Sequence, residues 1–584
     1  MIFRGGGLSG RTRFFLYALA AVSTCGLSLS FGSVGNFSWP LRGFDQLSAT
    51  LGEVRGRSLH TGVDIKTRGL NGHPVYAPAR GTVNRIVSKP NGYGNALFLS
   101  HEGIESVYGH LDSFGEGAAR LNTFIGIVKL MYNSDDIDFR FRTVRPIFER
   151  GQIVAYTGET GSGPPHLHYE LRTRDGYLNP LKFHALRDTE PPVIDRLYVC
   201  VEEEGSTVAE RAIRVRRGWR GYAPEEPSVS CAPGSRVFLK LACYDRVNSK
   251  NSVAIHRISV FENDRTAFTV GFDEIRFSDL RYGHMIYDIS KSTIDGSATY
   301  TYFLCRREGN AFSGIGAGGD GYFVPGREPR RLRIAVSDFA GNSSVVELTI
   351  RGGGDFVRPA GRVKPRRGVA AELVGPGGAV SVRLRGDSLR ADALVWLETP
   401  VSRDVARLAG GPGDMKESDL LAVCALHPFD LQYASPVDIA MKGPRGRDIM
   451  IYQFFEGRPP RPLPTSYIAS RGEYRARSAA GGYFALIRDT VPPVIGLPPT
   501  HEFLADEGPY RKLRLQVFDG LSRLDESSLE CMINGETLPC VYDNDRRWAE
   551  VVLPRAAFDG ACLHVFLKCS DAAGNTAVFS SPLR

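Results

Sequence analysis

The sequence predicts a mainly β protein built from several domains. Its 584 residues exceed what one hydrophobic core organises, because single cores stop growing beyond about 250–300 residues. The 65 glycines and 35 prolines fit many short strands joined by turns better than long helices. Two short motifs each occur twice, as repeated β modules would require. A content of 42% hydrophobic and 23% charged residues excludes wholesale disorder.

Residues 1–32 are predicted to be a signal peptide or an N-terminal anchor. Arginines give this segment a positive start, and an apolar run from Phe14 to Val22 follows. The run is short for a bilayer span. Cleavage shortly before residue 33 and acylation of Cys25 both stay open, and Thr24 is not the favoured neighbour of a lipidated cysteine. We therefore expect an exported protein of the periplasm or cell envelope, either free, anchored in the membrane through its N-terminus or held there as a lipoprotein.

The formal net charge of +8 is modest for this length and suits an anionic envelope polymer or membrane surface. The basic residues are dispersed and form no basic and aromatic cluster, which argues against nucleic acid as a partner. The ten cysteines form no Cys-x-x-Cys pair, so thiolate zinc sites and redox motifs are not predicted. Local pairing of Cys531 with Cys540, or of Cys562 with Cys569, stays open.

The first domain is expected at residues 33–187. Between Val75 and Leu111, short apolar runs alternate with glycine and proline turns, which is typical of an antiparallel sheet. This pattern puts His110 near the end of one strand and the pair His166 and His168 on a strand facing it. A groove floored by such a sheet would accept an extended peptide.

Five residues of this domain carry the chemistry that a catalytic zinc site needs: His60, Asp64, His110, His166 and His168. Each motif alone is weak, because a histidine and an aspartate near a glycine are common in polar turns. On extended segments, however, residues two or four apart share one face of the sheet. A catalytic zinc site takes three protein ligands and keeps one position open. Two imidazoles and one carboxylate meet this need and leave two histidines for proton transfer.

The order and context of these motifs resemble the M23 family of zinc metallopeptidases, the lysostaphin and LytM type that cuts peptidoglycan peptides. The resemblance covers roughly residues 40–183 and rests on the segments Gly62-Val-Asp64-Ile65, Gly72-His-Pro74-Val75, Tyr108-Gly-His110-Leu111, Gly151-Gln-Ile-Val-Ala155 and His166-Leu-His168-Tyr-Glu170. One departure is the run Gly161-Ser-Gly-Pro-Pro165, where the family usually has Ser-Thr-Gly-Pro-His.

The resemblance implies a role for each of the five residues. His60, Asp64 and His168 would bind one Zn²⁺ per chain. His166 would be the general base that acts on water, and His110 would orient or stabilise the oxyanion that forms when the amide is attacked. An imidazole with an ordinary pKa near 6.5 suits proton transfer at neutral pH.

Residues 112–146 form a predicted insertion in this domain. Apolar residues from Ala118 to Met131 follow helical spacing, and Phe139-Arg140-Phe141-Arg142 alternates like a strand. Because the insertion directly follows His110, two readings stay open: a lid that narrows access to the groove, and a structural buttress.

The remaining chain is predicted to form about three β-sandwich modules. Asp188-Thr-Glu-Pro-Pro192 recurs as Asp489-Thr-Val-Pro-Pro493, and Asp338-Phe-Ala-Gly-Asn342 recurs as Asp571-Ala-Ala-Gly-Asn575. These motifs resemble bacterial immunoglobulin-like modules, and they place the second module at 188–352 and the fourth at 488–584. Short apolar alternations predict a third β-sandwich module at 353–487.

The sequence therefore predicts a zinc-dependent endopeptidase that hydrolyses amide bonds in peptidoglycan stems or cross-bridges and remodels the cell wall. The β modules would position the enzyme or recruit envelope protein partners. The alternative is an envelope scaffold whose first domain binds peptidoglycan with little or no cutting.

Overall fold

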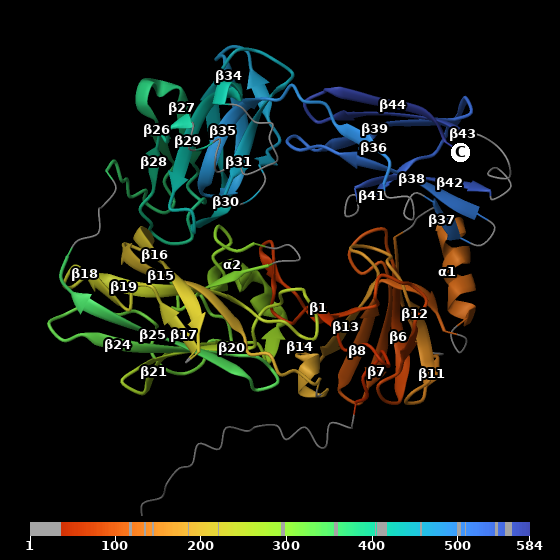
Figure 1. The fold of residues 1–584 in the computed structure, drawn as a ribbon, viewed down its shortest axis with the longest axis horizontal. Helices are drawn as coiled ribbons and strands as arrows, with labels where there is room; N and C mark the ends of the chain where they lie inside the picture. Colours follow the sequence, from red (N-terminus) through yellow and green to blue (C-terminus); the bar gives the residue numbers. More distant parts are fainter. Residues whose placement is uncertain are drawn as a thin grey trace, which may run out of the picture.

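The computed structural model confirms a mainly β fold with mostly antiparallel sheets (Figure 1). It describes residues 37–583 except 116–118, 133–135, 143–144, 185, 220, 294–297, 355–359, 403–404, 406–416, 456–457, 459, 499–503, 508–509, 544–546 and 555–562. The predicted signal segment and Cys25 lie outside the described residues. In the part of the chain that is described, no helix is long and apolar enough to cross a membrane.

The first domain contains the antiparallel sheet that the sequence predicts. The main sheet runs in the order β1 (Leu47–Ala49), β4 (Val63–Lys66), β13 (His166–Arg172), β8 (Ile104–Gly109), β7 (Asn95–His101), β6 (Gly81–Ser88) and β10 (Ile137–Arg140). A smaller sheet has the order β5 (Pro74–Tyr76), β12 (Ile153–Thr157) and β9 (Leu111–Phe114). Three further short strands are β2 (Val54–Arg55), which pairs with β3 (Ser58–Leu59), and β11 (Ile147–Phe148), which pairs with β6.

Strand β13 lies between β4 and β8, and its alternation creates two different faces. Leu167, Tyr169 and Leu171 are fully buried in the hydrophobic core of the first domain. Because side chains alternate along a strand, the intervening residues point to the opposite face. The pairing register places His168 directly opposite Asp64 of β4. The sheet thus brings together two residues that stand far apart in the sequence.

The insertion forms the predicted helix and strand. Helix α1 (Ala119–Tyr132) buries Leu121 and Ile125 against the domain, whereas Met131 is 72% exposed. Strand β10 covers Ile137–Arg140, so the predicted strand at residues 139–142 lies two residues too far along the chain. Pairing with β6 explains this register, because Ile137 faces Ser88 at the end of that strand. The insertion therefore extends the sheet at the edge remote from β4 and β13.

Each of the three predicted β-sandwich modules consists of two sheets around a shared hydrophobic core. The second module has β17 (Gly221–Pro224), β16 (Ser206–Gly218), β15 (Val193–Glu203), β19 (Arg236–Tyr244) and β23 (Tyr300–Phe303) facing β18 (Ser228–Cys231), β25 (Ser343–Gly352), β24 (Arg330–Ser337), β20 (Arg257–Glu262) and β21 (Arg265–Gly271). The third has β26 (Ala371–Val374), β27 (Val380–Leu384), β30 (Gln432–Lys442), β34 (Glu473–Ala480) and β33 (Ser466–Ile468) facing β28 (Trp396–Glu398), β29 (Leu420–His427), β35 (Gly482–Arg488), β31 (Ile449–Phe454) and β32 (Arg461–Pro462).

The fourth module has β36 (Val494–Gly496), β38 (Tyr510–Phe518), β42 (Trp548–Pro554) and β41 (Val541–Asp543), with β37 (Leu504–Glu507) beside β38, facing β40 (Glu536–Leu538), β39 (Leu524–Ile533), β43 (Leu563–Asp571) and β44 (Thr576–Leu583). Strand β25 ends at Gly352 and β26 begins at Ala371, whereas β35 ends at Arg488 and β36 begins at Val494. Cys531 and Cys540 are free thiols, so the first of the two local pairings that the sequence leaves open is not formed, and Cys562 of the second lies outside the described residues.

The first domain and the second module share their cores. Leu51 and Val54 of the first domain lie in the core of the second module, while Val247 and Val253 of the second module lie in the core of the first domain. In addition, β22 (Glu274–Arg276) of the second module pairs with β14 (Gly176–Leu178), which pairs with β13. The predicted boundary at residue 187 therefore separates two segments of the chain whose hydrophobic cores are packed together.

A buried charge cluster joins the second and third modules. The Lys240 ammonium lies 2.7 Å from a carboxylate oxygen of Asp288, 2.8 Å from one of Glu210 and 3.1 Å from one of Asp430. Asp430 belongs to the third module, and Arg307 also approaches it at 3.7 Å. Because a buried cation is costly without partners, these carboxylates hold Lys240 in its charged form.

Candidate metal centre

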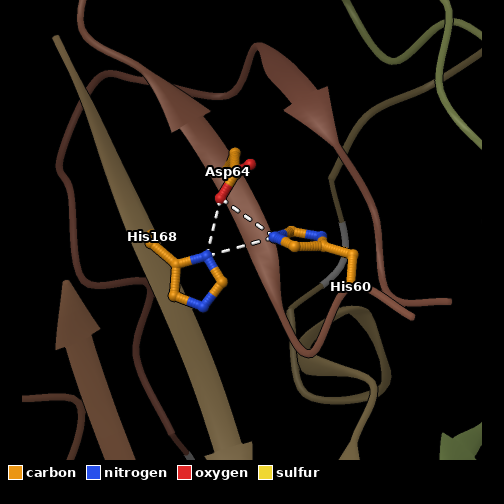
Figure 2. A group of neighbouring side chains, drawn as sticks. All are labelled: His60, Asp64 and His168. Atoms are coloured by element: carbon orange, nitrogen blue, oxygen red, sulfur yellow. Dashed lines mark hydrogen bonds and ion pairs between the residues drawn. The ribbon is translucent and has the colours of Figure 1, made fainter. Parts of the chain in front are cut away.

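Three side chains from β4, β13 and the loop before β4 point toward one another (Figure 2). Asp64 Oδ1 lies 2.7 Å from His168 Nδ1 and 3.2 Å from His60 Nε2. The two imidazole nitrogens are 3.1 Å apart. All three residues are buried. One carboxylate oxygen and two ring nitrogens thus share one small space.

The spacing of these three atoms fits a tetrahedral zinc ion. Ligand atoms that each lie about 2.0–2.1 Å from zinc are about 3.3 Å from one another in a tetrahedron. The three separations here, 2.7, 3.1 and 3.2 Å, are close to that value. Two imidazoles and a carboxylate are also a donor set that zinc accepts. Three protein ligands would leave a fourth position open.

Outer hydrogen bonds fix which ring nitrogen of each histidine faces the centre. His60 Nδ1 donates to the carbonyl oxygen of Thr50 at 2.9 Å, so Nε2 keeps its lone pair for a metal. His168 is oriented the other way, because its Nε2 donates to Glu170 Oε1 at 2.8 Å and its Nδ1 faces Asp64. A carboxylate behind a histidine ligand raises the basicity of the ligand and holds the ring in place.

Glu170 also belongs to this site, because it lies behind His168 and accepts a hydrogen bond from it. It is fully buried and accepts hydrogen bonds from Thr61, Tyr93 and Arg172 in addition to His168. Burial alone would raise the pKa of Glu170, but the hydrogen bond and charge of His168 and the charge of Arg172 lower it to about 2. The sequence does contain a signal for this placement: Glu170 follows His168 by two residues on a strand, so both side chains lie on the same face.

His110 and His166 lie beside the three ligand residues. Their ring centroids are 4.4 Å apart, and His166 Nε2 lies 3.7 Å from Asp64 Oδ1. His110 has a positive φ of 59°, an unusual conformation for this residue type, at the point where the chain leaves β8 and enters β9 of the other sheet. The structure therefore brings all five residues singled out in the sequence into one site.

Both of these histidines have a defined tautomer. His110 Nδ1 lies 2.8 Å from the carbonyl oxygen of Thr160, and His166 Nδ1 lies 2.7 Å from that of Pro164. A carbonyl can only accept, so Nδ1 carries the proton in each ring and Nε2 carries a lone pair. Thr160 is held close by Gly94, where a Cβ would stand 2.2 Å from the Thr160 carbonyl carbon.

Burial and charge set the protonation of the site. Burial would raise the pKa of Asp64, but the imidazoles of His60, His166 and His168 hold it well below its ordinary value. Burial, together with repulsion from His166 and His168, lowers the pKa of His110 to about 3. Burial would lower the pKa of His168, yet its hydrogen bonds to Asp64 and Glu170 raise it to about 9.

A cavity of about 760 Å³ opens onto these residues. Its walls include Arg55, Tyr93, the loop 162–165 and Asn251, which comes from the second module. Lys66 of β4 donates to the Asn251 side chain at 2.7 Å across this boundary. Within the described residues, the lining includes none from the insertion 112–146. The structure therefore favours the buttress reading of the insertion, and the second module takes the place beside the groove.

Comparisons with known proteins match part of the first domain. Residues 58–119 match the model of peptidase family M23. The chain is 30% identical over 125 residues to the "DD-carboxypeptidase/endopeptidase Mpg" of Neisseria meningitidis serogroup B, which covers 21% of this chain and 22% of that protein. It is 25% identical over 151 residues to the "Murein hydrolase activator NlpD" of Escherichia coli, covering 26% of this chain and 31% of that protein.

Among solved structures, a "zinc containing peptidase" from Vibrio cholerae is 24% identical, over 25% of this chain and 39% of that chain, with a TM-score of 0.18. The chain thus matches only about a fifth to a third of the length of these curated relatives. The matched family segment contains His60, Asp64 and His110. The first domain of this chain is accordingly a domain of peptidase family M23.

Proposed function

We propose that this protein is a zinc-dependent endopeptidase that hydrolyses amide bonds in the peptide stems or cross-bridges of peptidoglycan. The observation that carries the proposal is the convergence of His60, Asp64 and His168 at zinc-ligand spacing beside two further imidazoles. The M23 domain and the names of the relatives, one a peptidase and one a murein hydrolase activator, support peptidoglycan as the target.

In this proposal, His60 Nε2, Asp64 Oδ1 and His168 Nδ1 hold one Zn²⁺. When bound, zinc supplies a Lewis acid that polarises the scissile carbonyl and makes a water more acidic. Glu170 keeps the His168 ring oriented from behind. The groove outside the centre holds the extended substrate and limits the access of bulk water.

His166 is the general base in this mechanism. Its Nδ1 proton is committed to the Pro164 carbonyl, so its Nε2 is free to accept a proton from water. The same nitrogen faces the centre, as its 3.7 Å distance from Asp64 Oδ1 shows. The proton can then pass to the leaving amine from the same ring.

For His110 the structure supports a different role from the one the family resemblance implies. Donation to an oxyanion would require a second proton on Nε2, because Nδ1 already donates to Thr160. A pKa of about 3 opposes that second proton at neutral pH. We therefore infer that His110 accepts a hydrogen bond from the attacking water and orients it.

The remaining role is that of a scaffold or activator that binds peptidoglycan without cutting it, which the similarity to an activator favours. The predicted export signal and the similarity to proteins named as a murein hydrolase activator and a lipoprotein support a location in the periplasm or cell envelope for either function. Membrane attachment through Cys25 and recruitment of envelope proteins by the β modules belong to the same proposal.

Digestion of purified peptidoglycan separates the two functions. The zinc-loaded protein should release peptide fragments that mass spectrometry assigns to one type of bond. His166→Ala should retain one zinc per chain and lose at least about 100-fold in rate, since general-base catalysis contributes about 10²–10⁴-fold. His60→Ala should lose the zinc itself. A zinc-loaded wild-type protein that binds peptidoglycan but releases no fragment would overturn the enzyme and establish the scaffold.

A further inference from the structure

A second group of candidate metal ligands lies at the junction of the first domain and the second module. One carboxylate oxygen from each of Asp188, Asp245 and Asp338 lies within 4.8 Å of the other two. Asp245 and Asp338 are each only 3% exposed. Asp188 and Asp245 also line a cavity of about 470 Å³ at this junction.

The negative charge of these three aspartates is not fully compensated by the neighbouring groups that the structure describes. Asp245 Oδ1 is buried and has no hydrogen-bond partner. The guanidinium of the adjacent Arg246 donates to the Tyr244 hydroxyl at 3.3 Å. Burial and the neighbouring Asp338 and Asp188 raise the pKa of Asp245 to about 8. Two buried carboxylates beside a half-buried third are compatible with burial only if a cation or a proton compensates their charge.

The arrangement follows from the motif that recurs in the sequence. Asp188 precedes the first strand of the second module, Asp245 follows β19 and Asp338 opens the turn before β25. Asn342 closes this turn, because its side chain donates to Asp338 Oδ2 at 2.7 Å and to the Asp188 carbonyl at 3.2 Å. One amide thus ties two of the three acidic residues together.

The fourth module repeats this arrangement of aspartates and an asparagine. Asn575 donates to Asp571 Oδ2 at 2.8 Å and to the Asp489 carbonyl at 3.0 Å, and Asp519 follows β38 as Asp245 follows β19. Asp489 is 1% exposed, and its Oδ2 also lacks a partner. Each module therefore holds one buried aspartate oxygen without a hydrogen-bond partner, although at different positions of the motif: on Asp245 in the second module and on Asp489, the counterpart of Asp188, in the fourth.

We propose that Asp188, Asp245 and Asp338 bind a hard divalent cation of the calcium class at the junction of the first domain and the second module. Such ions take six to eight oxygen ligands at about 2.3–2.6 Å, so ligand oxygens lie up to about 4.8 Å apart. The three carboxylate oxygens lie within this limit. A site of carboxylates alone does not favour zinc, which prefers nitrogen and sulfur ligands.

The cation would stabilise the contact between the first domain and the second module. The chain that leaves Asp245 runs to Val253, and both Val247 and Val253 are buried in the core of the first domain. The Val247 carbonyl accepts from the Leu47 amide at 3.2 Å, and Asn251 reaches the catalytic groove. An ion at Asp245 would therefore fix the start of the loop that borders the groove.

Calcium binding to the zinc-loaded full chain tests the proposal without reference to peptidase activity. Titration calorimetry with CaCl₂ should show a dissociation constant of about 10⁻⁵–10⁻³ M, and Mg²⁺ should bind more weakly. Asp245→Asn, which keeps the shape and removes the charge, should bind one equivalent of Ca²⁺ fewer than the wild type. Asp188→Asn provides a second variant, and Asp195→Asn, with a side chain 52% exposed, is the matched control.

Thermal unfolding gives an independent readout. Saturating Ca²⁺ should raise the Tm of the wild type and of the Asp195→Asn control by several degrees, and should leave Asp245→Asn unchanged. Without Ca²⁺, Asp245→Asn should unfold at or above the wild-type Tm, because the substitution relieves repulsion. Absence of Ca²⁺ binding to the wild type, or an equal Ca²⁺ response in Asp245→Asn, would overturn the proposal and leave a protonated Asp245 as the compensation.

Discussion

Replacing Glu170 by glutamine tests whether the residues behind the metal centre control its affinity. Glu170 is fully buried, and its Oε1 accepts the Nε2 proton of His168 at 2.8 Å. Glutamine keeps the length of the side chain and an acceptor oxygen but removes the negative charge. Because outer carboxylates of this kind are worth about 10–100-fold in metal affinity, we expect the zinc dissociation constant to rise by that factor, or about 1.4–2.8 kcal/mol.

The substitution also affects Arg172, whose guanidinium donates to Glu170 Oε2 at 2.6 Å. Its other carboxylate neighbour, Glu105, is 3.9 Å away and 27% exposed. Glu105→Gln is therefore the matched control, since it removes the same charge near the same arginine without contact to His168. Zinc affinity would be measured by competition with a chelator at fixed pH. Equal dissociation constants for Glu170→Gln and the wild type would refute the role of this carboxylate.

The other predictions concern stability. Lys240→Met should lower the free energy of unfolding, measured by urea denaturation, by about 3–5 kcal/mol, because it leaves buried carboxylates without their cation. The control Lys364→Met changes a side chain that is 43% exposed and should lower the free energy of unfolding by less than about 1 kcal/mol. Burial lowers the pKa of His184 and of His284 to about 4, aided at His284 by nearby arginines. Since an unfolded histidine titrates near 6.5, their contribution is complete above that pH and is lost as the pH falls from 6.5 to 4, by on the order of 1–3 kcal/mol each. Urea denaturation midpoints measured at pH 7.5 and pH 5 should show this loss. A double His184→Met/His284→Met variant that loses as much stability between these two pH values as the wild type would contradict it.

Much of the site could be predicted from sequence because its parts are local. Alternation along a strand puts His166, His168 and Glu170 on one face, and the spacing from His60 to Asp64 places both near the start of one strand. What local patterns do not contain is the partner strand. The tautomer of His110 depends on the Thr160 carbonyl, which lies 50 positions further along the chain. Its functional role could therefore be taken only from resemblance, and the role that we propose for it differs.

In the fold, too, features set by local sequence could be predicted and features set by tertiary contacts could not. Short apolar alternations and turn residues predicted the sheets, and helical spacing predicted α1. The strand after α1 was placed two residues late, because its register is set by pairing with β6 and not by its own sequence. The exchange of core residues was not predicted either. Val247 and Val253 stand in a polar stretch that looks like a surface loop, and only the tertiary contact makes them core residues.

The exchanged core residues determine which part of this chain evolution can move as a unit. A gene segment that encoded only residues 33–187 would lack two valines of its own core and the strand β22 that extends its sheet. A segment that began at 188 would lack Leu51 and Val54 from the core of the second module. Neither piece could be shuffled into another protein without repacking. The first domain and the second module are therefore inherited as one unit. A substitution that adapts the groove is selected in the context of the second module beside it.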